Sequence, residues 1–289
     1  MSILNINNQT LNDARNLGRI NDLLGASLVE LSGGTVALTS DPAAIGAVSK
    51  LNAQNKRAQA AATNVQNAAS YVQSSDSFMK SISSVLGRMS ELSQYATDST
   101  KSSGDVSLYQ VEFKQLQDQL RETIGGTTAE IGGTTDIDKP LGTFNGVVVF
   151  GPSAGISVAS GSNAGHDIVI PETNLRKGAM LAMFQQDAAG NYTFSITDPA
   201  ASQKITDAIG DLATNRSILG GVSRRLDLAA QSLAVESQNI TSAVSGIQDV
   251  DVATASTRLS KLNILIASGT AMLSQANQSP KSVLQLLKS

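Results

Sequence analysis

Hydrophobic residues return every seven positions along two long stretches of the chain. In the second half the series is Ile205, Leu212, Leu219, Leu226, Leu233, Ile240 and Ile247, and no proline interrupts it. In the first half it is Leu51, Ala58, Val65, Val72, Met79 and Leu86. A strict seven-residue repeat keeps one stripe facing a partner helix when the two helices supercoil. The pattern therefore predicts two long helices, one from each half, that pair as a coiled-coil rod.

Shorter helices are predicted beside this rod. Apolar residues spaced by three and four predict one helix over 12–31, one over 106–124 and one beyond Asp251. Pro280 is expected to break or bend the last of these. The rod helices are expected to span about 43–98 and to start again after Pro199, and the helix over 106–124 is expected to return antiparallel against the first rod helix.

Residues 125–198 differ in composition: they are rich in Gly, Thr, Ser and Pro and contain short β-branched runs. The runs predict strands over 147–150, 156–159, 167–170 and 192–196, with turns at Asn145-Gly146 and Gly190-Asn191. The expected fold class is mainly α, with long antiparallel coiled-coil rods formed by the N- and C-terminal halves and a small β-rich insert.

Composition and charge narrow the choice of partners. The 289 residues carry 21 basic and 24 acidic side chains, for a net charge of -3, so there is no excess of cations for a nucleic acid. The chain lacks the run of about 20 apolar residues that spans a membrane. The N-terminus has no basic, apolar and small-residue signal order, so any export is expected to use a dedicated route.

Residues that carry catalytic chemistry are scarce. The chain has no Cys and a single His, His166, which is interpreted as an ordinary loop residue. Gly125-Gly126-Thr127-Thr128 and Gly132-Gly133-Thr134-Thr135 lack the Lys-Ser/Thr of a phosphate loop and are interpreted as a flexible link. Asp249 and Asp251 are interpreted as helix-start residues rather than cation ligands. No catalytic, cofactor or metal site is expected, and neither is enzyme activity.

Four segments near the C-terminus together resemble the end of bacterial flagellin. They are Ile247–Ala255, Leu262–Gly269, Met272–Pro280 and Val283–Leu287. Arg216–Leu226 is similar to the stretch that opens the flagellin C-terminal rod, and Asp41–Ala44, Leu86–Leu92 and Phe144–Gly146 follow in the family's order. The resemblance implies a structural subunit, exported unfolded through the flagellar secretion channel, that polymerises into the extracellular helical filament used for motility. Implied partners are further copies of the chain, an export chaperone, and the filament cap and junction proteins.

The resemblance also implies a division of the chain. Residues 1–42 and 250–289 would form the inner tube, residues 43–146 and 199–249 the rod, and residues 147–198 a short outer insert. Inner-tube packing would be carried by Leu17, Ile20, Leu24, Leu31, Leu259, Leu262, Ile266 and Leu273. Candidate lateral contacts are Arg88, Met89, Glu91 and Leu92, for which a plain solvated face is the alternative.

Other functions fit parts of the same pattern. The hook-filament junction protein of the flagellum shares the architecture, and its Ser-Asp-Asp-Pro stretch is similar to Ser40-Asp41-Pro42, whereas Ala276-Asn277-Gln278 favours flagellin. A secreted coiled-coil adhesin or toxin translocator is a further alternative, because heptads alone do not distinguish these classes.

Overall fold

The computed structural model describes residues 2–36, 41–152, 155–163 and 165–286, with side chains described within 11–278 of these ranges. The helices are α1 (Ser2–Gly33), α2 (Pro42–Ala96), α3 (Ser103–Ile124), α4 (Thr128–Ile131), α5 (Gly178–Phe184), α6 (Ala201–Gln248) and α7 (Val252–Leu286). The predicted mainly α fold is confirmed. The contacts between residues divide the chain into two compact units. The first unit comprises Met1–Gln54 and Gln238–Ser289, and the second comprises Asn55–Ser237.

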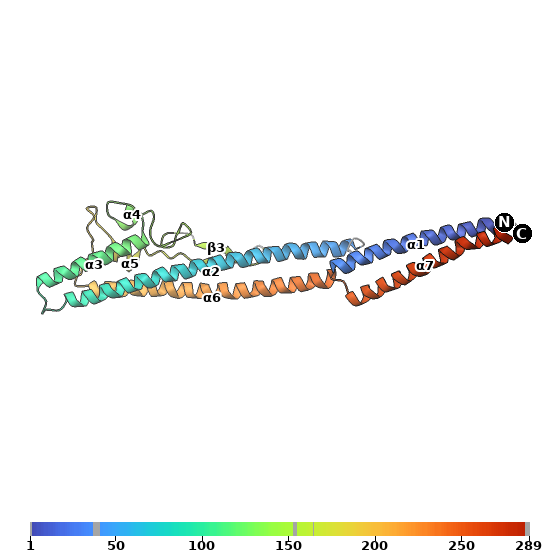
Figure 1. Ribbon diagram of the computed structural model, residues 1–289. Coiled ribbons are helices and arrows are strands. Elements are labelled where there is room, and N and C mark those ends of the chain that lie inside the picture. The colour runs from blue at the N-terminus through green and yellow to red at the C-terminus, as the bar shows by residue number, and fades with distance from the viewer. Residues whose placement is uncertain (1, 37–40, 153–154, 164, 287–289) are drawn as a thin grey trace. The chain divides into compact units, whose positions relative to one another are not determined.

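Helices α2 and α6 run antiparallel through the second unit (Figure 1). Their direction follows from side-chain contacts, because the residue number rises along α2 as it falls along α6. The contacts join Asn55 to Ser237 at 2.7 Å, Asp76 to Arg216 at 2.8 Å, and Gln94 to Ser202 at 3.1 Å. These pairs fix the register of the two helices.

The seven-residue series supplies the core between α2 and α6. Each member within the second unit is at most 3 % exposed: Ala58, Val65, Val72, Met79, Leu86, Ile205, Leu212, Leu219, Leu226 and Leu233. Burying this apolar stripe is the main stabilising contribution expected for such long helices, since isolated helix formation gives little in water.

Helix α3 returns along α2, as the sequence predicts. The Ser102 hydroxyl accepts a hydrogen bond from the Asp105 amide, and the Asp105 carboxylate accepts one from the Ser102 amide, which caps the start of α3. The Tyr95 and Tyr109 rings lie 5.8 Å apart across the turn between the helices. Phe113, Leu120 and Ile124 bury the inner face of α3.

Two short antiparallel hairpins pack in the second unit. β1 (Thr143–Phe144) and β2 (Val147–Val148) are joined at Asn145 and Gly146, whose φ values of 49° and 78° are those of a primed hairpin turn. The predicted strand over 147–150 is shorter than expected, because the Val149 amide donates to the Gly142 carbonyl and its own carbonyl accepts from the Thr173 hydroxyl.

The second hairpin pairs β3 (Ile156–Ala159) with β4 (Asp167–Ile170), at the predicted bounds. Its connecting loop is tied to both long helices of the second unit. The Arg57 Nε donates to the Ser162 carbonyl at 2.9 Å, and the Ser162 hydroxyl donates to the Glu236 carboxylate at 2.5 Å. The hairpin is thereby fixed over the α2 and α6 pair.

The strand predicted over 192–196 is wrong. Tyr192 makes a single bridge to Gln186, and the chain then follows α3 without a ladder. The Gln117 amide donates to the Phe194 carbonyl at 3.0 Å, and the Gln110 amide oxygen accepts from the Ile196 amide at 3.0 Å. Side chains of α3 thus occupy the backbone groups that a neighbouring strand would have paired.

The interpretation of the Gly-Thr repeats as a flexible link is also wrong. They flank α4, where the Glu130 carboxylate accepts from the Thr127 amide at 3.2 Å. Gly132 ends this helix at a φ of 69°, and a Cβ built there would lie 1.9 Å from the Gln186 carbonyl oxygen. Backbone contact at that distance requires glycine, so the repeat is a tightly packed turn.

In the first unit, α1 and α7 lie side by side and antiparallel (Figure 1). The Val36 amide donates to the Gln248 carbonyl at 2.8 Å, and the Val250 amide donates to the Gly34 carbonyl at 3.0 Å. These two bonds join the segment that follows α1 to the end of α6 and the link before α7.

The bounds of both terminal helices differ from the prediction. α1 begins at Ser2 rather than near Asn12. α7 continues past Pro280 to Leu286, so the missing amide removes one helical hydrogen bond without ending the helix.

Candidate assembly surfaces

The residues predicted for inner-tube packing face the seam between α1 and α7. Leu262 is buried, and the other predicted members are half-buried: Leu17, Ile20, Leu24, Leu31, Leu259, Ile266 and Leu273. Gly269 permits a close approach, since a Cβ built there would lie 3.0 Å from the Leu17 Cδ1. Within a single chain, these residues already cover one another in large part.

A second set of large apolar side chains on these two helices is exposed in the single chain, and no role was assigned to it from the sequence. Its members are exposed large side chains on both terminal helices: Leu11, Leu23, Leu28 and Val29 of α1, with Val252, Ile264, Leu265 and Met272 of α7. We call these residues the outward apolar set. The signal was present as apolar residues on more than one face of each helix, a pattern typical of helices that are covered on several sides.

A groove of about 200 Å³ lies between α1 and α7 in the first unit. Leu17 and Ile20 of α1 line it opposite Leu265 and Met272 of α7, with Asp13 also part of its lining. The groove joins the intramolecular seam to part of the outward apolar set. Asn16 and Ser268 add polar groups, so the lining is partly apolar and partly polar.

The ends of the seven-residue series are less buried than its middle. In the first unit Ile240 is buried, Leu51 is half-buried, and Ile247 is 36 % exposed. On α6, Ile218, Leu228 and Val235 are exposed outside the series. The rod helices therefore expose apolar side chains to solvent in addition to those that they bury against each other.

The four candidate lateral-contact residues fall into two environments. Met89 and Leu92 are fully buried in the second unit. Arg88 lies partly exposed, and its guanidinium donates to the Glu112 carboxylate at 2.7 and 3.1 Å and to Glu91 at 2.9 Å. The hydrogen bond from Arg88 lowers the pKa of Glu112. Arg88 and Glu91 are thus the two of the four whose side chains are exposed.

Polar side chains of α3 bind two neighbouring segments, one around α4 and one around Tyr192. The Arg121 guanidinium donates to the Ile131 carbonyl at 2.9 Å and to the Gly132 carbonyl at 2.6 Å, and its burial lowers its pKa. The Tyr192 hydroxyl donates to the Asp118 carboxylate, and burial raises the pKa of Tyr192. These contacts fix the α4 turn and the segment around Tyr192 against one face of α3.

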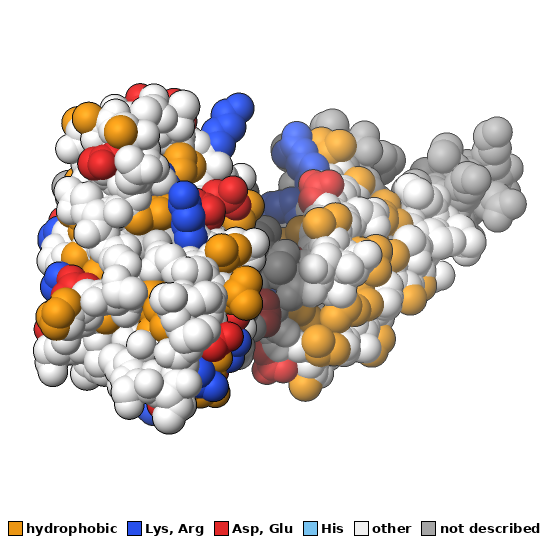
Figure 2. Space-filling view, turned by 90° about the vertical axis from the view of Figure 1, so that its left-hand side faces the viewer, with side chains coloured by type: hydrophobic (Ala, Val, Ile, Leu, Met, Phe, Trp, Pro, Cys, Tyr) orange, Lys and Arg blue, Asp and Glu red, His pale blue; other side chains and the backbone are white. Residues whose placement is uncertain are grey.

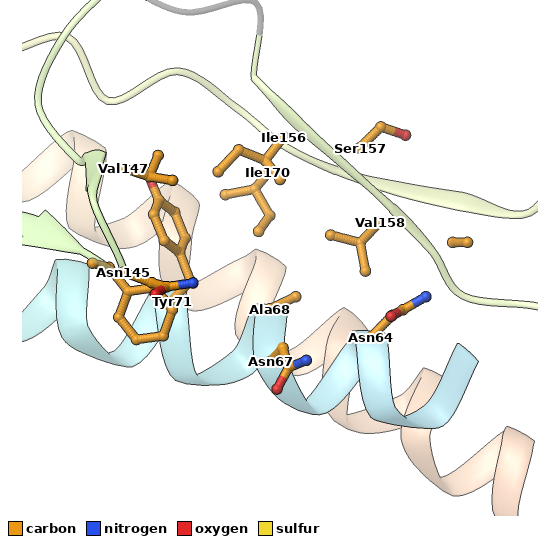
Figure 3. A pocket seen from close by; sticks show the side chains of 12 residues that line it. Asn64, Asn67, Ala68, Tyr71, Asn145, Val147, Ile156, Ser157, Val158 and Ile170 are labelled. Carbon is orange, nitrogen blue, oxygen red and sulfur yellow. The ribbon is translucent and has the colours of Figure 1, made fainter. Parts of the chain in front are cut away.

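A second groove, of about 320 Å³, lies between α2 and the two hairpins. Figure 3 shows Ile156, Val158 and Ile170 directed from the strands toward α2, where Ala68 and Tyr71 face them. The Tyr71 ring meets Phe144 edge-on, with centroids 5.7 Å apart, and burial raises the pKa of its hydroxyl. The lining named here is aliphatic and aromatic, which favours packing over acid-base chemistry.

Side chains suited to catalysis stay dispersed. His166 is exposed in the loop before β4, and its carbonyl accepts from the Ser160 amide and hydroxyl at 2.8 Å. Among the described residues, no three His, Cys, Asp or Glu side chains gather as metal ligands would. On the face shown in Figure 2, basic and acidic side chains are interspersed among polar and hydrophobic ones.

Asp251 begins α7, as its interpretation as a helix-start residue predicts. Its carboxylate accepts from the Ala253 amide at 3.0 Å and from the Thr254 hydroxyl at 2.6 Å. These hydrogen bonds lower the pKa of Asp251. None of the helices in the described ranges combines the length and apolar character needed to cross a membrane.

Two family models match the helical parts of the chain. One, described as the bacterial flagellin N-terminal helical region, matches residues 4–130, and the other, the bacterial flagellin C-terminal helical region, matches residues 202–287. The chain belongs to the bacterial flagellin family. The residues between the two matched regions include both hairpins and α5.

Several flagellar proteins match almost the whole length of the chain. The chain is 32 % identical to a flagellin of Halalkalibacterium halodurans, over 99 % of the chain and 100 % of that protein. It is 30 % identical to flagellin FlaB2 of Treponema pallidum and 29 % identical to the flagellar filament 33 kDa core protein of Treponema phagedenis, with the same two coverages.

Flagellins are structural proteins that form self-polymerised filaments, and this chain is such a filament subunit. The resemblance stated from the sequence is confirmed, and the hook-filament junction alternative is not better supported. Its relatives imply an extracellular component of the flagellar filament.

Proposed function

We propose that the chain polymerises chiefly through the outward apolar set on α1 and α7. The observation that carries this proposal is the exposure of large apolar side chains such as Val29, Ile264 and Met272 in a single chain. Soluble monomers rarely keep many such residues uncovered on neighbouring helices. Packing against further copies would remove them from water.

The proposed division of labour follows the expected three parts. Residues 1–42 and 250–289 would build the inner tube, residues 43–146 and 199–249 the rod, and residues 147–198 an outward insert. The seam residues of α1 and α7, from Leu17 to Leu31 and from Leu259 to Leu273, would hold each subunit's own helix pair together. The outward apolar set would contact neighbouring subunits.

The association is heterologous, meaning that two different patches of one chain meet on successive copies. Such an interface repeats without closing and generates an open helical polymer. Arg88 and Glu91 are proposed to add lateral contacts between rods, with Met89 and Leu92 supporting them from the core beneath.

Export and the remaining partners complete the proposal. The chain would leave the cell unfolded through the flagellar secretion channel, bound beforehand by an export chaperone. It would then be incorporated beneath a filament cap on a base of junction proteins. Its role would be structural, with no enzyme activity.

The test is seeded elongation of the purified full chain, followed by light scattering and electron microscopy. Long helical polymers are expected, whereas a stable monomer or a short capped complex would overturn the proposal. Removing residues 259–289 should leave the second unit folded but abolish elongation.

A point variant tests the outward apolar set directly. Ile264→Asp places a charge on an exposed apolar position and should prevent elongation, because a buried unpaired carboxylate is costly. Asn263→Asp adds the same charge at the adjacent exposed polar position and is the matched control. Elongation of Ile264→Asp at the rate of this control would contradict the proposed surface.

A further inference from the structure

The methionines of the described residues differ sharply in exposure. Met79, Met89 and Met183 are fully buried, and Met180 is 1 % exposed. Met272 is 66 % exposed. A dissolved oxidant therefore reaches the Met272 thioether directly, whereas the other four sulfur atoms are shielded by the core of the second unit.

The exposure of Met272 matters because this residue lies on a surface that is proposed to be buried in the polymer. Met272 belongs to the outward apolar set and lines the groove between α1 and α7, together with Leu17, Ile20 and Leu265. Leu265 lies seven residues earlier, on the same face of α7. A change of polarity at the Met272 sulfur would thus alter a surface that the proposed assembly buries.

We propose that Met272 is a selective oxidation site, and that its conversion to the sulfoxide prevents the free subunit from joining the polymer. This inference rests on the proposed function of the outward apolar set. It adds a covalent modification that acts on the subunit before assembly.

The reaction is a two-electron oxygen transfer from a peroxide. A lone pair of the Met272 sulfur attacks one oxygen of hydrogen peroxide, the O–O bond breaks, and the second oxygen leaves as water after proton transfer. Sulfur is oxidised to the sulfoxide and the peroxide is reduced. The product replaces a flexible apolar side chain with a polar, chiral one.

The sulfoxide oxygen is a hydrogen-bond acceptor without a donor of its own. Of the polar groups that line the groove, the Asp13 carboxylate only accepts hydrogen bonds when ionised, whereas the Asn16 amide and the Ser268 hydroxyl can also donate. Packing the polar sulfoxide against Leu17, Ile20 and Leu265 in the polymer is unfavourable wherever it is held away from these donors. We expect about a tenfold rise in the concentration of subunit needed for elongation.

The experiment treats full-length monomer briefly with hydrogen peroxide and maps the oxidised methionines by peptide mass. Addition of one oxygen is expected at Met272 before Met79, Met89, Met180 or Met183. Seeded elongation is then measured before and after treatment with methionine sulfoxide reductases, which should restore it. The peptide map also separates oxidation at Met1, which lies outside the described residues.

Two variants identify the residue responsible. Met272→Leu keeps the apolar surface and should elongate normally with or without peroxide. Met79→Leu removes a buried sulfur by a nearly volume-conserving change and should remain as sensitive to peroxide as the unmodified sequence.

The outcomes separate this inference from the assembly proposal. If untreated protein and Met272→Leu both fail to elongate, the assembly proposal itself is overturned. If both elongate, the oxidation inference is overturned by normal elongation of protein oxidised at Met272, or by equal peroxide inhibition of Met272→Leu.

Discussion

Replacing Gly132 by alanine should destabilise the second unit far more than a positive φ angle alone would. Gly132 has a φ of 69°, a conformation that costs a residue with a Cβ about 1–2 kcal/mol. The added Cβ would also lie 1.9 Å from the Gln186 carbonyl oxygen. That separation is far inside van der Waals contact, so the two backbone segments must move apart.

Moving these two segments apart would also break hydrogen bonds at this site. The Gln186 amide donates to the Ile131 carbonyl at 3.2 Å, and the Arg121 guanidinium donates to the Gly132 carbonyl at 2.6 Å. Loss of two bonds of this kind, one to a charged group, adds about 2–4 kcal/mol. We therefore expect Gly132→Ala to lower the free energy of unfolding by about 3–6 kcal/mol.

Gly190→Ala is the matched control for the backbone conformation. Gly190 has a φ of 84°, but the nearest atom to a Cβ built there is 3.8 Å away, on Thr134. This variant should lose only about 1–2 kcal/mol. The comparison uses urea unfolding followed by near-ultraviolet circular dichroism, because Tyr192 lies on the bridge to Gln186. Losses that agree within about 0.5 kcal/mol would refute the steric argument.

Three further variants address the rod and the start of α7. Leu226→Ala removes a fully buried side chain and should lower the free energy of unfolding in urea by about 2–5 kcal/mol. Leu228→Ala changes an exposed position two residues later and should lower it by less than about 0.5 kcal/mol. Equal losses would contradict the assigned seam. Arg216→Gln breaks the partly exposed ion pair with Asp76 and should lower the free energy of unfolding by less than about 1 kcal/mol. Because salt screens the pair, this loss should be smaller in 1 M salt. A loss that does not change with salt would argue for a packing role. The pKa of Asp251 is lower in the folded than in the unfolded chain. Its carboxylate therefore stabilises the fold above about pH 4, the ordinary aspartate range, and this stabilisation is lost as the pH falls through the lowered folded pKa. In Asp251→Asn, amide exchange at the start of α7 should lose this pH dependence relative to the unmodified chain, and identical profiles would exclude Asp251 as its source.

The long helices were predictable because their signal is periodic and repeated. The interval from Ile205 to Ile240 repeats one physical requirement at every seventh position, so no single exception changes the result. The β3 and β4 hairpin was predictable because two short β-branched runs flank a glycine-containing connection.

The rest of the 125–198 region depends on contacts between distant residues. The segment over 192–196 has the β-branched and aromatic composition of a strand, but Gln110 and Gln117 of α3 take its backbone groups. Nothing local in that segment specifies this outcome. The ordered turn around Gly132 likewise depends on Gln186, which lies more than fifty residues away.

The candidate surfaces show a different limit of sequence patterns. Periodicity found the stripe containing Leu17 and Leu262, which faces the neighbouring helix of the same chain. It did not find Ile264 and Met272, because a sequence shows that a helix has several apolar faces without showing which of them its own chain covers. The roles of both stripes in subunit packing stay predictions.

The antiparallel pairing of α2 and α6 restricts how this protein can change in length. Deleting one residue from either helix rotates everything beyond it by about 100° and turns the buried stripe toward water. A tolerated deletion would have to remove whole heptads, and remove them from both helices at matching heights, such as those marked by Asp76 and Arg216. Shortening or lengthening the shaft thus demands paired edits in two widely separated stretches of the gene.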